Sequence, residues 1–156
     1  MEMNNFDISD TLIMILDQTA RIERALAVRY FNEQKDVNLT FNEFLILNAI
    51  KKNPGIYQRD LAKLVLIGTA NLSKELDKLE DKKFIERKIK PLGKKVVKTL
   101  HISKSGIKQL SEITLAMQKY IIQMESIFSE VEYAQFREYM QRLRNKFTES
   151  IDMVFE

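Results

Sequence analysis

The sequence predicts a mainly α-helical protein with one short β-hairpin. The 156-residue chain contains only 4 Gly and 2 Pro, fewer turn residues than an all-β fold requires. Apolar residues recur at steps of three and four along most of the chain, whereas residues 85–102 alternate between polar and apolar side chains. These patterns place helices on both sides of a single hairpin.

The composition excludes several classes of protein. Because the chain has no Cys, it has no disulfide scaffold, thiolate nucleophile or Cys-type zinc site. The first residues lack a basic segment before an apolar core, and apolar stretches such as residues 64–67 are far shorter than the about 20 residues that cross a bilayer. We therefore expect a cytoplasmic protein with no membrane partner.

The basic residues are concentrated in the middle of the chain. Residues 57–104 carry 13 basic and 6 acidic side chains, whereas residues 1–56 and residues 105–156 each carry 6 basic and 8 acidic ones. This distribution is typical of a polyanion-binding face. A solvated lysine-rich surface is the alternative interpretation.

The first two helices are predicted from their spacing and caps. Residues 8–31 form an amphipathic helix. A second helix begins after Thr40, whose side chain can cap it while Glu43 bonds back to the cap's own N–H, which makes a capping box. This helix must end near Lys52, because Pro54 follows shortly after it.

Two more helices follow, and a hairpin comes after them. The third helix spans roughly residues 58–66 and the fourth residues 69–83, with a tight break at Ile67-Gly68. The fourth helix buries a leucine stripe and exposes short polar and basic side chains. Residues 85–90 and 96–102 then form the hairpin, and residues 91–95 form its basic turn.

The carboxyl-terminal third is helical again. One helix starts at Ser103 and continues to Phe128. Ser129 and Glu132 make a second capping box, which marks a new helix amino terminus rather than one unbroken rod. The last helix keeps its apolar spacing as far as Val154.

Three helices followed by a two-stranded wing make a winged helix-turn-helix, which we place at residues 36–103. In this architecture the last of the three helices reads the major groove of DNA. Its short polar side chains can reach base edges, while lysines of the helix and wing neutralise phosphates. Any one of these lysines, taken alone, could instead belong to a solvated face. The predicted DNA-binding residues are Thr69, Asn71, Ser73, Lys74, Lys78, Arg87, Lys88, Lys90, Lys94 and Lys95.

The long flanking helices, residues 6–35 and 104–156, are predicted to form a helical dimerisation region. Their apolar stripes exceed what a three-helix domain needs to cover its core, so we expect a homodimer. An intramolecular helical bundle is the alternative. A two-fold dimer would present its recognition helices to successive major grooves, about 34–36 Å apart, on a pseudo-palindromic site. The predicted dimer-interface residues are Ile8, Leu12, Ile15, Met140, Leu143, Phe147, Ile151 and Val154.

Residues 39–110 resemble the MarR (multiple antibiotic resistance regulator) family of winged-helix transcription factors. Four motifs match. They are Leu-Thr at residues 39–40, Gln-x-x-Leu-Ala at residues 58–62, a segment that begins with Leu-Glu and ends with Phe-Ile-x-Arg at residues 79–87, and Ile-Ser-x-x-Gly at residues 102–106. The resemblance implies DNA-facing positions on the fourth helix and at the tip of the wing. These positions are Thr69, Asn71, Ser73 and Lys74 on the helix, and Lys94 and Lys95 at the tip. It also implies a small anionic or aromatic effector between the dimer helices and the winged-helix core, for which the sequence identifies no residues.

The sequence departs from the family pattern at three places. Lys83 stands where the family commonly has Gly, so the helix must either adopt a left-handed residue at a cost of about 1 kcal/mol or run on. Tyr57 replaces a small capping residue, which leaves the third helix without a usual cap. Residues 93–95 replace the Asp-x-Arg turn of the wing.

Enzymatic activity is not expected. His101, the sole histidine, has no carboxylate or nucleophile near it in the sequence, and no Gly-rich phosphate loop or metal-ligand spacing occurs. We therefore predict no cofactor and no metal, and a function as a sequence-specific transcriptional regulator. The resemblance to the MarR family implies that this regulator is a repressor released by a ligand. The alternative is a winged-helix protein-interaction module, or an antagonist that pairs with another regulator through its long helices.

Overall fold

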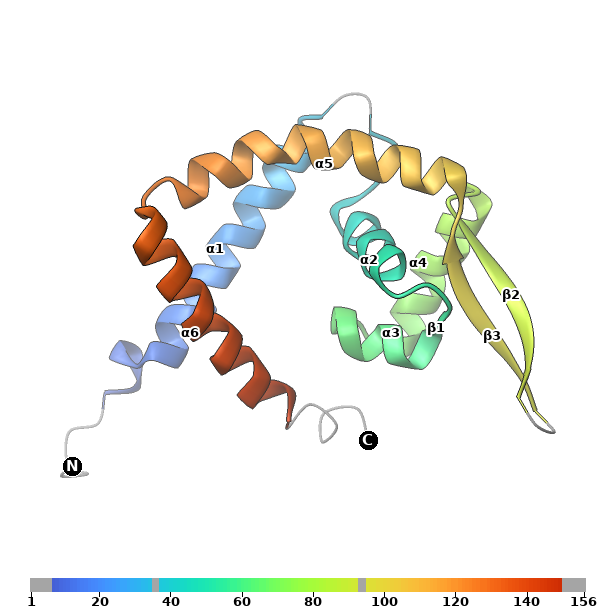
Figure 1. Cartoon of the computed structure of the whole chain (residues 1–156), viewed down its shortest axis with the longest axis horizontal. Coiled ribbons are helices and arrows are strands. Elements are labelled where there is room, and N and C mark those ends of the chain that lie inside the picture. Colours follow the sequence, from blue (N-terminus) through green and yellow to red (C-terminus); the bar gives the residue numbers. More distant parts are fainter. Residues whose placement is uncertain (1–6, 35–36, 93–94, 150–156) are drawn as a thin grey trace.

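The structure is a computed structural model that describes residues 7–34, 37–92 and 95–149, without the side chains of Leu92 and Lys95. Within these ranges no helix is both long and apolar enough to cross a membrane. The elements in chain order (Figure 1) are the 3-10 helix η2 (Ile8–Asp10), α1 (Leu12–Asn32), α2 (Phe41–Lys52), β1 (Ile56–Tyr57), α3 (Gln58–Val65), α4 (Thr69–Asp81), β2 (Ile85–Leu92), β3 (Lys95–Ile102), α5 (Lys104–Glu125) and α6 (Glu130–Thr148).

The predicted mainly α winged helix-turn-helix is confirmed, as are both capping boxes. The Thr40 N–H donates to Glu43 Oε2 at 2.7 Å, and the Glu43 N–H donates to Thr40 Oγ1 at 3.2 Å. Ser129 and Glu132 make the same reciprocal pair at the start of α6.

The first predicted helix is not continuous. Thr11 has an extended backbone, with φ −75° and ψ 149°, and it separates η2 from α1. The Thr11 side chain accepts from the Met14 N–H at 3.3 Å and so caps α1. The prediction of one helix over residues 8–31 was therefore wrong at its start, because a threonine that can cap a helix interrupts it.

The sheet differs from the prediction in two respects. It has three strands in the order β1-β3-β2, all antiparallel, because the two-residue β1 pairs with β3 beside the wing. The strands are paired through to Leu92 and Lys95, so the turn predicted over residues 91–95 was too long. Pro91 fits within β2 because β2 is an edge strand, where a residue without an N–H loses no ladder bond on the open side.

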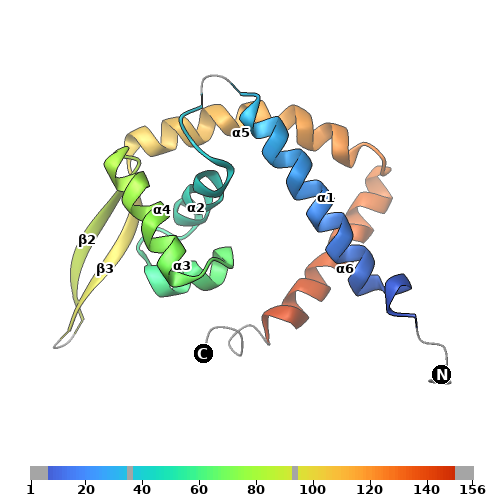
Figure 2. The same cartoon turned by 180° about the vertical axis from the view of Figure 1, so that it is seen from behind.

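One cluster of buried residues holds the molecule together. It includes Phe31 of α1, Ile46 of α2, Leu76 of α4, Leu100 of β3 and Ile113 of α5. Figures 1 and 2 show the winged-helix elements beneath the first half of α5, with α1 and α6 beside its second half. The winged-helix region thus shares a core with α1 and α5, and the boundaries at residues 36–103 remain a prediction.

The end of α4 shows which of the two alternatives at Lys83 occurs, a left-handed residue or a longer helix. Lys83 adopts a left-handed conformation with φ 60°. Its N–H donates to the Glu80 carbonyl at 2.8 Å, and the Phe84 N–H donates to the Leu79 carbonyl at 2.9 Å. These two bonds are a Schellman motif, so α4 stops here rather than running on.

The start of α5 is fixed against this same turn. The side chains of Ser103 and Ser105 both donate to the Lys83 carbonyl at 2.6 Å, and the Ser103 N–H donates to the Phe84 carbonyl at 3.0 Å. A Cβ atom at Gly106 would lie 2.1 Å from the Phe84 carbonyl oxygen. The Ser-x-Ser-Gly segment therefore allows the backbone at the start of α5 to contact the backbone of the turn at residues 83–84.

We predict that Gly106→Ala lowers the free energy of unfolding by about 3 kcal/mol, because the added methyl group must push α5 away from the turn. Urea denaturation followed by circular dichroism measures this change. Gly68→Ala is the matched control, since a Cβ atom there meets nothing within 4 Å. Equal effects of the two substitutions would contradict the close approach.

Candidate nucleic-acid interface

The turn between α3 and α4 aims the candidate recognition helix. Leu66 caps α3 in a left-handed conformation with φ 54°, and the Ile67 N–H donates back to the Ala62 carbonyl at 3.2 Å. Tyr57 makes no side-chain cap at the other end of α3, as its sequence position suggested. The chain then turns at Gly68 into α4, so the predicted break is confirmed.

Helix α4 has one buried stripe and one exposed arc. Leu72, Leu76 and Leu79 are fully buried in the core. The predicted DNA-binding residues of this helix lie outside that stripe. Thr69, Asn71, Lys74 and Lys78 are exposed, and Ser73 is half-buried.

Arg87, a predicted DNA-binding residue, forms two ion pairs within the chain. It lies at the base of β2 with only 17% of its side chain exposed. Its guanidinium pairs with Asp77 Oδ1 at 2.7 Å and with the Glu80 carboxylate. Arg87 therefore holds the wing against α4 and neutralises two carboxylates there, and its contact with DNA stays a prediction.

The two lysines of α4 also differ from each other. The Lys78 ammonium donates to Glu75 Oε1 at 2.9 Å, and this hydrogen bond, together with the charge of Glu75, raises the pKa of Lys78. Lys74 is exposed and has no ion-pair partner within the described residues. Of the two lysines of α4, Lys74 is therefore the one whose charge is not paired within the described residues.

A buried ion pair that the sequence did not predict fixes the far end of α4. The Lys82 ammonium lies 2.8 Å and 2.9 Å from the two carboxylate oxygens of Glu43, which is fully buried, and 3.2 Å from the Asn38 carbonyl. Glu43 already had a local explanation as a capping-box residue. Its partner lies 39 residues away, so only the tertiary structure could reveal the pair.

The wing carries exposed cations along both strands. Lys88 and Lys90 are exposed on β2, with Lys88 only 3.8 Å from Glu86. The predicted contact Lys94 lies outside the described residues, and so does the side chain of Lys95. Lys98 on β3, which the sequence analysis left unassigned, is also exposed, and the alternation of that strand was the signal that could have identified it.

The predicted dimerisation faces are uncovered in the single chain. Ile8, Leu12 and Ile15 are exposed at the start of the chain, and α6 has no buried residue along its length. Met140 and Leu143 are half-buried and Phe147 is exposed, whereas Ile151 and Val154 lie outside the described residues. Over the part of the chain that the structure describes, an intramolecular bundle therefore does not bury these faces.

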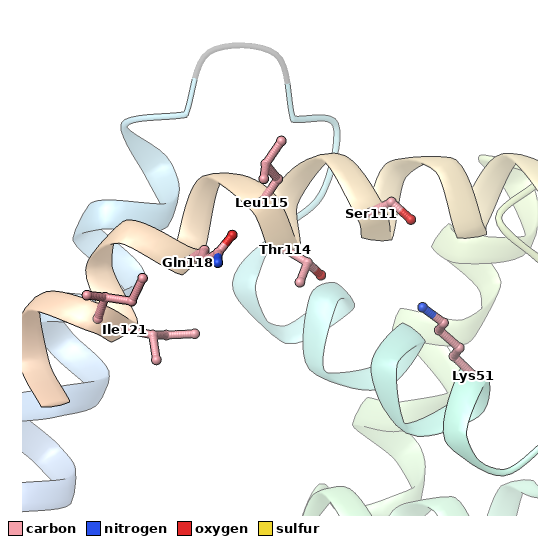
Figure 3. A pocket seen from close by; sticks show the side chains of 7 residues that line it. Lys51, Ser111, Thr114, Leu115, Gln118 and Ile121 are labelled. Carbon is pink, nitrogen blue, oxygen red and sulfur yellow. The ribbon is translucent and has the colours of Figure 1, made fainter. Parts of the chain in front are cut away.

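Two hollows border these elements. A cavity of about 380 Å³ lies between α5 and the end of α2, where Thr114, Gln118 and Ile121 of α5 face the space toward Lys51 (Figure 3). A cleft of about 440 Å³ runs along α4 beside Arg24 of α1. The Arg24 guanidinium donates to Asn42 Oδ1 at 2.6 Å, which holds it in that cleft.

His101 has a structural partner. Its Nε2 lies 3.0 Å from Thr99 Oγ1 on the same strand. Among the described residues no group of three or more His, Asp or Glu side chains is placed to hold a metal ion.

Comparisons with known proteins agree with this geometry. Residues 37–95 match the sequence profile of the MarR family. The uncharacterized HTH-type transcriptional regulator YybA of Bacillus subtilis (strain 168) is 34% identical over 84 residues, which are 54% of this chain. The match spans 56% of the length of that relative.

Solved structures extend the likeness to nearly the whole chain. The transcriptional regulator SlyA is 28% identical with a TM-score of 0.77, over 90% of this chain and 98% of that one. A MarR protein from Peptoclostridium difficile, at 18% identity, has a TM-score of 0.78 over 99% and 97% of the two chains. The S. aureus MepR–DNA complex, at 20% identity, has a TM-score of 0.70 over 90% and 99%.

The fold and the comparisons define the class of this protein as a winged helix-turn-helix. More narrowly, it is a MarR-like winged helix, and the resemblance read from residues 39–110 is confirmed.

We predict that Lys82→Met lowers the free energy of unfolding by about 3 kcal/mol, because it leaves the Glu43 carboxylate buried without its cation. Glu43→Gln should cost less, since the amide oxygen still accepts from the Thr40 N–H. In the double variant the two effects should be less than additive, which a denaturation double-mutant cycle measures. If the two changes in unfolding free energy simply add, Lys82 and Glu43 are not coupled and the prediction is wrong.

Proposed function

We propose that this chain is a sequence-specific DNA-binding transcriptional regulator. The observation that carries the proposal is the charge arrangement of α4. Three of its four carboxylates, Glu75, Asp77 and Glu80, are each paired with a cation, and the fourth, Asp81, is the last residue of the helix. Asn71 and Lys74 are exposed, and Lys74 has no ion-pair partner among the described residues. A helix of this kind can approach phosphates with three of its four carboxylates neutralised and its polar groups available for base edges.

The proposal includes a homodimer on a pseudo-palindromic operator. The exposed apolar residues of α1 and α6 support it, because such faces are stable in water only when something covers them. A two-fold axis through these helices would place two copies of α4 in successive major grooves. MepR, which shares this fold, was solved as a complex with DNA.

The proposal also includes repression that a small anionic or aromatic effector releases. The cavity between α2 and α5 supports it, since it combines the Lys51 ammonium with the apolar side chains of Leu115, Ile121 and Ile122. The PcaV regulator of Streptomyces coelicolor, 15% identical to this chain, was solved with its natural ligand. Because the partner is DNA, we also propose a cytoplasmic location.

A protein-interaction module or an antagonist of another regulator is the second candidate. The uncovered faces of α1 and α6 favour it as much as they favour a homodimer. The two candidates differ in chemistry, because phosphate contacts weaken with salt and apolar helix pairing does not.

We expect the protein to bind duplex DNA with an affinity that falls steeply with salt, and Lys74→Gln to reduce the slope of log K against log salt by about 0.9, the value for one phosphate contact. Fluorescence polarisation over a salt series, with sequencing of the duplexes retained from a random pool, measures both affinity and operator. Lys119→Gln is the control, since Lys119 is exposed on α5 away from α4. An absence of binding at low salt would reject the DNA-binding function.

We expect Leu12→Glu together with Phe147→Glu to convert a dimer into a monomer, because each places a charge on an uncovered apolar face. Sedimentation velocity measures the change, with Lys108→Glu, on the winged-helix half of α5, as the control. A monomeric wild-type protein at micromolar concentration would reject the homodimer and leave DNA binding to be judged separately.

A further inference from the structure

The cavity between α2 and α5 is lined almost entirely by one helix. Apart from Lys51 at the end of α2, every lining residue belongs to α5, and these residues recur at steps of three and four along one stripe. The stripe from Ser111 to Ile122 is about 16 Å long, at about 1.5 Å per residue. The cavity is therefore a long, narrow groove, which we call the α5 groove.

The end of the α5 groove nearest Lys51 is polar (Figure 3). The Lys51 side chain is exposed and has no ion-pair partner in the described part of the chain. Ser111 Oγ donates to the Ile107 carbonyl at 2.9 Å. Thr114 Oγ1 donates to the Leu110 carbonyl at 2.6 Å. Because each hydroxyl has one hydrogen and already donates it, both can only accept from a ligand. The Lys51 ammonium is thus the charged donor at this end, and it favours an anion.

The rest of the α5 groove is aliphatic. The side chains of Leu115, Ile121 and Ile122 are 70%, 45% and 59% exposed, although all three are large and apolar. Among the described residues that line the groove there is no aromatic ring on which a planar ligand would stack. An extended alkyl chain, by contrast, contacts these side chains in turn and removes their apolar surface from water.

The charge of Lys51 also distinguishes a small ligand from a second copy of this chain. A helix that covered the groove would bury the ammonium without a partner unless it supplied an acid at that point, and a buried unpaired charge is costly. One molecule with a carboxylate at one end and an alkyl chain behind it is complementary to both ends of the groove.

We propose that the α5 groove binds an unbranched aliphatic carboxylate, such as a medium-chain fatty acid. The carboxylate pairs with the Lys51 ammonium, and the alkyl chain lies along α5 past Gln118 to Ile122. The inference rests on the proposed effector-released repression and names the chemical class of that effector as aliphatic rather than aromatic. The ligand contacts the end of α2 through its charge and α5 through its chain.

A chain-length series tests the aliphatic part of the groove. Isothermal titration calorimetry of the full-length protein without DNA measures the binding of hexanoate, octanoate and decanoate, each below its micelle concentration. We expect each added methylene group to lower Kd about fourfold, the effect of burying one CH₂ group. Salicylate should bind more weakly than decanoate. Equal affinities along the series, or tighter binding of salicylate, would overturn the proposal.

Substitutions test the two ends of the groove separately. We expect Lys51→Met to weaken decanoate binding about fivefold, the effect of losing one exposed ion pair, and to leave the binding of decanol unchanged. Lys52→Met is the matched control, since Lys52 is exposed at the same helix end but does not line the groove. Ile122→Ser should weaken the binding of both decanoate and decanol. Decanoate binding that Lys51→Met leaves unchanged would overturn the assignment of the site.

Two further measurements separate this inference from the proposed function. Fluorescence polarisation with duplex DNA should show that decanoate lowers the affinity for DNA. Lys51-dependent decanoate binding by a protein that does not bind DNA would support the site and reject the DNA-binding function, whereas unchanged DNA affinity would overturn the effector role alone. Sedimentation velocity without ligand should show the same oligomeric state for Ile122→Ser and the wild type. A change would overturn the proposal, because a second copy would then cover the groove.

Discussion

The buried carboxylate of Glu43 is the constraint on which the geometry of the proposed DNA-facing surface depends. One of its oxygens accepts from the Thr40 N–H at the start of α2, and both lie within 3 Å of the Lys82 ammonium at the end of α4. A buried carboxylate is tolerable only while these partners remain in place, so the start of α2 and the end of α4 are held together. This ion pair therefore sets the direction of α4 and the position of its exposed residues.

The same region also fixes the wing. The turn at Lys83 leads directly into β2, Arg87 joins β2 to the carboxylates of α4, and Gly106 lets α5 rest on the turn itself. Recognition helix and wing base therefore behave as one unit. Only the outer half of the wing extends beyond these contacts. There one face carries Lys88 and Lys90, and the other carries the exposed apolar side chains of Ile89 and Val96 together with Lys98.

The sequence predicted the features that depend on local spacing and missed those that depend on tertiary pairing. The capping boxes and the left-handed alternative at Lys83 involve residues within a few positions of one another, so a linear pattern contains them. The Lys82 partner of Glu43 and the carboxylates that pair with Arg87 come close only through folding, so no linear pattern contains these ion pairs. Strand β1 has only two residues, too few to show a period.

Helix α5 connects the uncovered apolar faces of α1 and α6 with the proposed DNA-facing surface. This helix begins where Gly106 contacts the turn after α4, and its buried residues continue from there to Tyr120. The ring centroid of Tyr120 lies 5.2 Å from that of Tyr30 on α1. Beyond that point α6 has no buried residue. A change in how α6 pairs with another chain would thus act on a helix whose other end is locked to the recognition unit. The cavity at Lys51 lies between these two ends, so the proposed effector would contact both α5 and α2 there and could favour one arrangement of them over another.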